Sequence, residues 1–193
     1  MRSYDLHSNN HSSYTKERKI ASDVHAYIFE ENYRQLLHLL NFYTFNPEAP
    51  HHEQPHHRQD AHQLFLLEIA RLASNYFFAA KALNQHLALI NAEVPALLKH
   101  PVGYFVKDLQ TFILNHALPI ICENAIKPHL RPDDHPAIYF DKSVLLAWSH
   151  WHEKSIAFLN DQDDYFEILD VINLYATLTL DAQMHFLDTA HNV

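Results

Sequence analysis

The residues with the most distinctive chemistry lie in one short stretch of the chain. Five of the eighteen histidines fall between His51 and His62, together with Glu53 and Asp60. Imidazole binds zinc, nickel and copper, and it is the side chain that changes its charge near neutral pH. The composition of the stretch therefore predicts a segment that attracts metal ions and responds to acid.

Part of this stretch matches a catalytic signature. His52, Glu53 and His56 spell HExxH, and with His62 the run resembles the longer pattern of the metzincin zinc peptidases. In such enzymes the two histidines share one face of a helix and bind zinc, while the glutamate acts as general base on the zinc-bound water. Pro55 lies between the two histidines and would break that helix. The sequence therefore argues against a protease at this position.

The prolines indicate that these histidines belong to a loop. Residues 46–59 contain three prolines and no aliphatic side chain larger than that of Ala49, so we expect a solvated, mobile connection there. A flexible loop can still gather histidines around a borderline metal such as zinc. The candidate metal ligands in this region are His52, His56, His57 and His62.

A second pair of candidate metal ligands lies near the end of the chain. Asp181 and His185 are four residues apart in a segment expected to be helical, and side chains at that spacing lie on one face of a helix. His86 and His116 lie on or beside apolar stripes, which favours hydrogen-bonded core histidines over ligands. If either set binds a cofactor, that cofactor is zinc or another divalent transition metal.

The scarcity of glycine excludes several classes of site. Gly103 is the only glycine in the 193 residues. Phosphate-binding loops, dinucleotide fingerprints and nucleophile elbows each need more than one glycine for tight turns and close backbone approaches. The composition therefore points to helices joined by turns of proline, asparagine and aspartate.

The charge of the chain bears on its partners. Lysine and arginine number 14 against 23 aspartates and glutamates, a formal net charge of −9 with neutral histidine. Nucleic-acid binding depends on neutralising phosphates, so this balance opposes a nucleic-acid partner. Protonation of all eighteen histidines would reverse the sign of the net charge, which predicts a response to acid.

The compartment is predicted from three further features. The single cysteine, Cys122, cannot form an internal disulfide. The first twenty residues are polar and show no signal-peptide pattern, and the apolar runs are too short to span a membrane. We therefore expect a cytoplasmic protein without a membrane partner.

Apolar periodicity predicts an all-α fold, a single-domain bundle of five or six helices. Residues 1–20 are expected to form a flexible polar arm, and residues 21–193 the helical domain with its His/Pro-rich loop after the first long helix. Pro119 is expected to kink or split the helix that contains it. The predicted helices span residues 22–46, 60–93, 101–127, 141–160 and 163–188.

These features favour a non-enzymatic helical module over an enzyme. No organised catalytic set accompanies the long, aromatic-rich helices, so we expect a protein that acts by binding a protein partner or as a homodimer. The alternative is a metal-binding or metal-dependent helical protein that uses the histidine and carboxylate ligands named above. A pH-responsive element is a third possibility.

Overall fold

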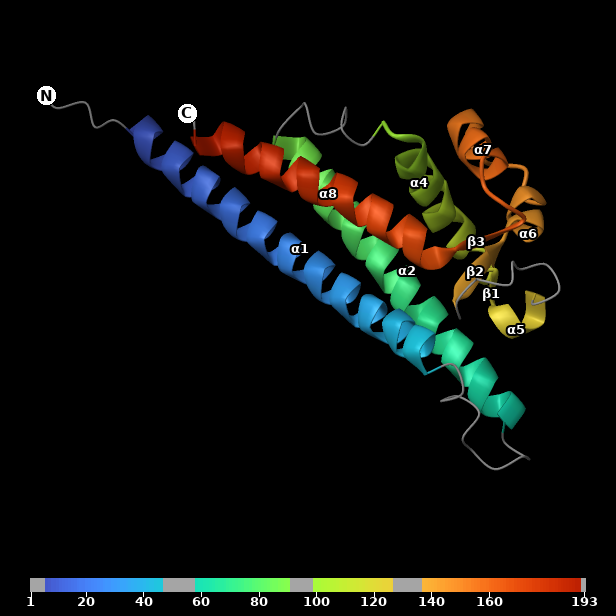
Figure 1. Cartoon of the computed structure of the whole chain (residues 1–193). Helices are drawn as coiled ribbons and strands as arrows, with labels where there is room; N and C mark the ends of the chain where they lie inside the picture. Colours follow the sequence, from blue (N-terminus) through green and yellow to red (C-terminus); the bar gives the residue numbers. More distant parts are fainter. Residues whose placement is uncertain (1–5, 47–57, 91–98, 127–136, 192–193) are drawn as a thin grey trace, which may run out of the picture.

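Helices form most of the structure, as the apolar periodicity predicts (Figure 1). The computed structural model describes residues 6–46, 58–90, 99–126 and 137–191. Within these ranges, only the backbone is described for residues 6–22, 58–62, 90, 123–124 and 185–191. Among the described residues, no helix is both long and apolar enough to cross a membrane.

Two long helices, α1 (Leu6–Phe45) and α2 (Arg58–Ile90), lie side by side and run in opposite directions (Figure 1). The strongest helical prediction, residues 60–93, corresponds to α2 and is confirmed as far as Ile90, since residues 91–93 lie outside the described residues. The predicted start of the first helix, near Ser22, is too late. Because neither proline nor glycine interrupts residues 6–45, nothing in the sequence breaks the helix before it reaches Leu6.

A third long helix, α8 (Ile168–His191), packs against both α1 and α2 (Figure 1). Two tyrosines connect the three helices. The hydroxyl of Tyr76 on α2 donates to the carbonyl of Ile172 at 2.9 Å, and that of Tyr33 on α1 donates to Asn173 Oδ1 at 3.0 Å. These hydrogen bonds fix the position of α8 along the α1–α2 pair.

The other half of the molecule contains a small sheet that the all-α prediction missed. Its antiparallel order is β1-β2-β3, with Ile120 opposite Phe140 and Phe140 opposite Phe166. Helix α4 (Pro101–Ile113) precedes the sheet. The remaining elements are β1 (Ile120–Cys122), α5 (Glu123–Ile126), β2 (Ile138–Asp141), α6 (Lys142–Leu146), α7 (Glu153–Asn160) and β3 (Tyr165–Glu167).

Three predicted helices are therefore shorter than expected. The helix predicted over residues 101–127 is interrupted, but it ends at Ile113, before it reaches Pro119, and the residue after Pro119 begins β1 rather than a second part of the helix. The helix predicted over 141–160 is divided into α6 and α7, and the first residues of that predicted over 163–188 form β3. The strand segments are rich in isoleucine and aromatic residues, which pair well across a sheet. The pairing joins residues far apart in sequence, so helical periodicity alone does not reveal it.

An aromatic cluster joins α4 to the sheet and to α7. Phe105 is fully buried. Its ring centroid lies 4.9 Å from that of Phe158 and 5.5 Å from that of Trp151. The rings of Phe140 and Phe166, from β2 and β3, contact it edge-on. Aromatic packing of this kind stabilises the position of α4, which forms one wall of the site described below.

Most of the predicted His/Pro-rich loop, residues 47–57, lies outside the described residues. Cys122 is buried in β1, in agreement with its apolar sequence surroundings.

Candidate functional site

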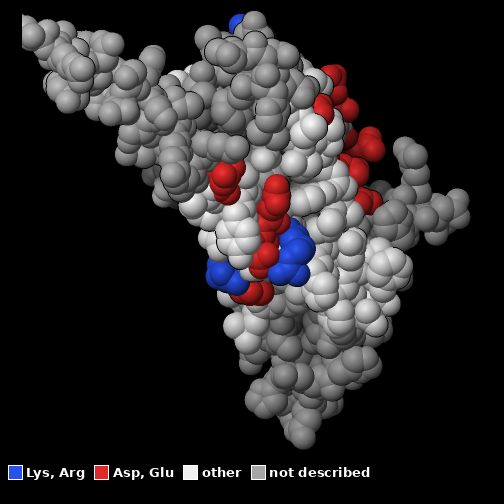
Figure 2. Space-filling model, turned by 90° about the vertical axis from the view of Figure 1, so that its left-hand side faces the viewer, with Lys and Arg blue, Asp and Glu red and all other residues white. Residues whose placement is uncertain are grey.

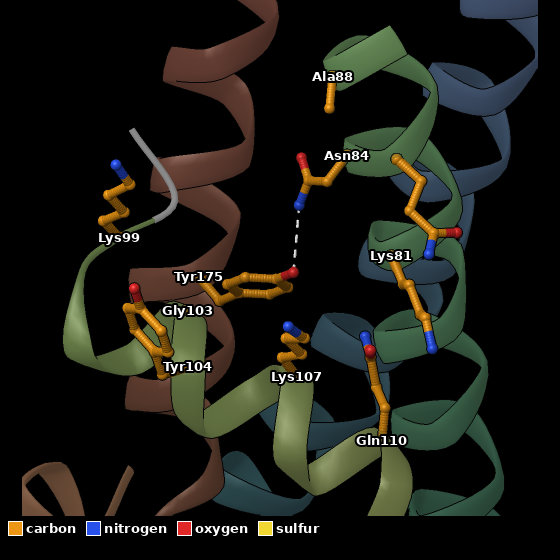
Figure 3. A pocket seen from close by; sticks show the side chains of 10 residues that line it. Lys81, Asn84, Ala88, Lys99, Gly103, Tyr104, Lys107, Gln110 and Tyr175 are labelled. Carbon is orange, nitrogen blue, oxygen red and sulfur yellow. Dashed lines mark hydrogen bonds between the residues drawn. The ribbon is translucent and has the colours of Figure 1, made fainter. Parts of the chain in front are cut away.

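A cavity of about 380 Å³ lies among α2, α4 and α8 (Figure 3). This volume falls within the range of about 300–1,000 Å³ that is typical of small-molecule sites. The described residues that line the cavity are Lys81, Asn84, Gln85, Ala88, Lys99, Gly103, Tyr104, Lys107, Gln110 and Tyr175.

Helix α2 contributes one face to the cavity. Four residues of α2 line the cavity, and their spacing of three, one and three residues places them on the same side of the helix. They are Lys81, Asn84, Gln85 and Ala88. The buried apolar positions of α2, such as Leu83 and Leu87, alternate with them and pack into the core. The same part of α2 therefore contributes side chains to both the hydrophobic core and the cavity wall.

Helix α4 forms the facing wall, and its beginning is well defined. His100 is the N-cap residue, and its Nδ1 accepts a hydrogen bond from the backbone N–H of Val102 at 3.3 Å. Pro101 occupies the first helical turn, where a missing N–H costs nothing. The α4 residues that line the cavity, Gly103, Tyr104, Lys107 and Gln110, then follow at helical spacing.

The cavity is lined by cations. Lys81, Lys99 and Lys107 are three of the chain's eight lysines, and no aspartate or glutamate is among the described residues that line the cavity. Figure 3 shows these three lysines on different sides of the cavity. The arrangement is unexpected in a chain of net charge −9 and makes the cavity a favourable place for a negative charge.

Other described surfaces have a different charge pattern. On the face drawn in Figure 2, acidic side chains line one edge, and the basic side chains in the middle lie against acidic ones. Arg34 pairs with Glu31 on α1 at 2.7 Å, and Arg71 pairs with Glu68 on α2 at 2.5 Å. These ion pairs lower the pKa of both glutamates, chiefly through the hydrogen bonds from the arginines. No such carboxylate partner lies among the described residues around the cavity.

Buried amides form the inner part of the cavity. The side-chain nitrogen of Asn84, a residue only 5% exposed, donates to the hydroxyls of Tyr175 at 3.1 Å and Thr179 at 3.2 Å. Gln110, which is 1% exposed, donates from Nε2 to the carbonyl of Phe77 at 2.6 Å. The side-chain oxygen of Asn84 is buried and has no hydrogen-bond partner among the described residues.

The hydroxyl of Tyr175 is held in its neutral form. Burial raises the pKa of Tyr175 to about 12, an effect that the hydrogen bond from Asn84 partly offsets. Because the phenol oxygen accepts this hydrogen bond, the hydroxyl keeps its own proton to donate. Figure 3 shows the ring reaching from α8 across the cavity toward Asn84.

Helix α7 supports the cavity wall through Tyr104. The ring of His152 stacks on that of Tyr104 with centroids 4.8 Å apart, and the Lys154 ammonium lies 4.7 Å from the Tyr104 ring centroid. Asp108 Oδ2 accepts from the backbone N–H of His152 at 2.7 Å and from the hydroxyl of Ser155 at 2.6 Å. Asp108 therefore connects the beginning of α7 to α4, next to Tyr104.

The residues predicted as metal ligands are not part of this cavity. His52, His56 and His57 lie outside the described residues. His62 lies in α2 and His185 in α8, but their side chains are not described, and Asp181 is exposed on α8. Among the residues that the structure describes, no group of three or more histidine, cysteine, aspartate or glutamate side chains could hold a metal ion.

The two histidines predicted on or beside apolar stripes, His86 and His116, have aromatic neighbours. The ring of His86 lies 5.1 Å from that of His25 on α1, and exposed His116 lies 4.7 Å from the ring of Phe112. The half-buried position of His86 agrees with a packed histidine, whereas His116 lies at the surface rather than in the core.

None of the cavity residues was predicted as a site residue. The available signal was the polar series Lys81, Asn84 and Gln85 in the mostly apolar segment 76–90, together with the only glycine, Gly103, in a helical segment. Neither signal reveals on its own that α2 and α4 face each other.

Comparison with protein-family models, curated proteins and solved structures finds no match to this chain. The features of the cavity that matter are its three lysines, its buried amides and its tyrosine hydroxyl, which are the groups able to contact a ligand.

Proposed function

We propose that this protein is a non-enzymatic helical module that binds a small anionic ligand in the cavity among α2, α4 and α8. The observation that carries the proposal is the convergence of Lys81, Lys99 and Lys107 on a cavity of ligand size without a described carboxylate to neutralise them. Protein-bound anions are typically held by such cationic and hydrogen-bond-donating groups. Tyr175 adds a neutral hydroxyl donor to the set.

The lining residues favour binding over catalysis. Among the described residues that line the cavity, the lysines and tyrosines are the groups that could transfer a proton or attack a substrate, and no histidine, cysteine, serine, aspartate or glutamate lines the cavity with them to activate them. The amide nitrogens of Asn84 and Gln110 donate hydrogen bonds to neighbouring groups, which holds these side chains in place.

The lysines should contribute measurably to affinity. Two unit charges 4 Å apart interact by about 1 kcal/mol in a water-like environment and by more where water is partly excluded. Three ammonium groups near one anion would therefore change the dissociation constant by roughly 100-fold in the absence of screening, and by less at physiological salt.

Fluorescence titration with anilinonaphthalene sulfonate (ANS) tests the proposal. We expect the protein to bind one ANS per chain, and the triple variant Lys81→Gln, Lys99→Gln, Lys107→Gln to bind it at least about tenfold more weakly. Lys142→Gln is the matched control. This substitution removes one positive charge, where the triple variant removes three. The ammonium of Lys142 donates to the carbonyl of Gln162, outside the cavity.

Two further measurements keep this test specific. Phenylnaphthylamine, a neutral analogue of ANS, should bind the protein and the triple variant equally, because it has no charge for the lysines to attract. Circular dichroism should show that all variants remain helical. Unchanged ANS affinity in the triple variant, or the absence of ANS binding to the natural protein, contradicts the proposal.

A second candidate function is the binding of a protein partner or a second copy of the chain. Large apolar side chains are exposed where α1 ends and α2 begins, at one end of the helix pair (Figure 1). The ring contact between Tyr43 and Phe65, at 5.2 Å, shows that these two segments are adjacent. The exposed residues are Phe42, Phe45, Leu64 and Leu67. Exposed apolar groups of this kind are typical of interaction surfaces.

The metal-binding alternative remains a proposal based on sequence alone. It depends on His52, His56 and His57, which lie outside the described residues, and on His62 and His185, whose side chains are not described. Elemental analysis of untagged protein as isolated tests it directly, because a structural metal would remain bound through purification.

A further inference from the structure

The position of the only glycine has no backbone explanation. Gly103 lies in the first turn of α4, and no residue in the described part of the chain, glycine included, has a positive φ angle. Glycine is less stable than alanine in such a helical position, because it loses more backbone entropy on folding. A requirement for backbone conformation therefore does not account for Gly103.

The cavity accounts for it. Gly103 lines the cavity opposite α2, and any other residue would place a Cβ atom there. The rings of Tyr104 and Tyr175 lie next to Gly103, and the methyl group of Ala88 lies farther along the cavity, beyond Asn84 (Figure 3). Bare backbone next to these rings leaves room for the apolar body of a ligand.

Asn84 indicates a second property of the ligand, a hydrogen-bond donor. Its side chain is 95% buried, since 5% is exposed, and its oxygen has no hydrogen-bond partner among the described residues. Figure 3 shows this oxygen pointing toward Ala88, which also lines the cavity, while the amide nitrogen points toward Tyr175. This oxygen has almost no accessible surface, so a ligand donor reaches it once the Asn84 side chain turns toward the cavity. Because a buried acceptor without a partner is unfavourable, that hydrogen bond adds affinity.

We infer that the cavity binds an organic acid with an apolar body and a hydrogen-bond donor. The anionic group pairs with Lys81, Lys99 and Lys107, the apolar body lies against Gly103, and the donor reaches the side-chain oxygen of Asn84. This inference rests on the proposed function, since it specifies the class of anion that the same cavity takes.

Isothermal titration calorimetry with three kinds of probe tests the inference. The probes are inorganic phosphate, naphthoate, and hydroxynaphthoates with the hydroxyl group on the ring that does not bear the carboxylate. We expect naphthoate to bind at least about tenfold more tightly than phosphate, because it buries apolar surface. At least one hydroxynaphthoate should bind about fivefold more tightly still, because its hydroxyl pairs with Asn84.

Two variants assign these gains to residues. Gly103→Ala should weaken naphthoate binding at least about fivefold while raising the melting temperature, because it fills the cavity and favours the helix. The matched control is Thr111→Ala, an exposed position on the same helix, which should raise stability without changing affinity. Asn84→Leu should remove the preference for the hydroxylated probe, so that hydroxynaphthoate and naphthoate bind this variant with equal affinity.

The outcomes separate this inference from the proposed function. Equal affinity for phosphate and naphthoate, or unchanged naphthoate binding in Gly103→Ala, overturns the inference that the ligand has an apolar body. The donor requirement is overturned if no hydroxynaphthoate gains affinity, or if the gain persists in Asn84→Leu. In each of these cases, loss of ANS binding in the triple lysine variant would still support the proposed anion site.

Discussion

Asn84, Tyr175 and Thr179 show how a polar site is built inside an apolar helix bundle. The amide nitrogen of Asn84 donates a hydrogen bond to each of the two hydroxyl oxygens, so α2 and α8 are connected without a buried charge. A buried charge would need a partner and would cost several kcal/mol of desolvation. Neutral hydrogen-bonding groups allow the cavity to remain polar while the charged lysines keep their ammonium groups near its edge, where water can reach them.

The raised pKa of Tyr175 predicts a loss of stability at high pH. Burial raises the pKa of Tyr175 from 10 to about 12, so the folded state favours the neutral phenol. The corresponding stabilisation is fully present below about pH 10 and is lost as the pH rises from about 10 to 12. In urea unfolding, the fall in the free energy of unfolding over this range should be shallower in Tyr175→Phe than in the natural protein.

Tyr76 provides the reference for this measurement. Burial also raises the pKa of Tyr76, and this residue is unchanged in Tyr175→Phe, so part of the alkaline sensitivity should persist. Identical pH dependence in the variant and the natural protein would show that Tyr175 is ionised as easily in the folded as in the unfolded chain.

At the scale of elements, the helices of the first half were largely predictable and those of the second half were not. The apolar positions of α2 repeat along one face, a local pattern that any helix must satisfy. Helices α6 and α7 are short and lie between strands, so their stability comes from tertiary contacts such as Trp151 Nε1 donating to the Leu145 carbonyl at 2.7 Å. Contacts of this type cannot be read from periodicity.

The connection between α4 and α7 depends on one carboxylate. Asp108→Ala removes the acceptor for the buried Ser155 hydroxyl and for the His152 N–H. We expect it to lower the free energy of unfolding by about 1–3 kcal/mol, because two donors lose their partner. Asp108→Asn keeps one acceptor oxygen and should cost less.

Denaturant unfolding measures this effect. The matched control is Asp163→Ala, an exposed carboxylate in the loop before β3, which should change stability by no more than about 0.5 kcal/mol. Equal stability of Asp108→Ala and Asp163→Ala would show that the α7 connection does not depend on Asp108.

At the scale of the whole molecule, the exposed apolar end of the α1–α2 pair raises the question of self-association. Phe45 is 80% exposed and Leu64 is 65% exposed, which leaves apolar surface uncovered in the single chain. Burial of such surface would contribute about 25 cal/mol per Å² to association.

Light scattering at several concentrations tests whether this surface binds a second copy. We expect a mass above that of one 22.6 kDa chain, and a return to that mass in Leu64→Glu, Leu67→Glu. Leu89→Glu is the matched control, because Leu89 is 77% exposed at the other end of α2. A monomer at all concentrations, without a copurifying partner, would contradict the proposed interaction surface.

The sequence by itself determined the mostly helical class and the approximate extent of α2, because these depend on interactions between near neighbours. It also predicted an interruption of the helix after Pro101, although the helix ends at Ile113 rather than at Pro119. It also showed that Gly103 is unique, although not why. Only the tertiary structure decided that β1 pairs with β2 and that Lys81, Lys107 and Tyr175 surround one cavity. These residues come from three separate helices, and their meeting depends on how the helices pack, which no local pattern encodes.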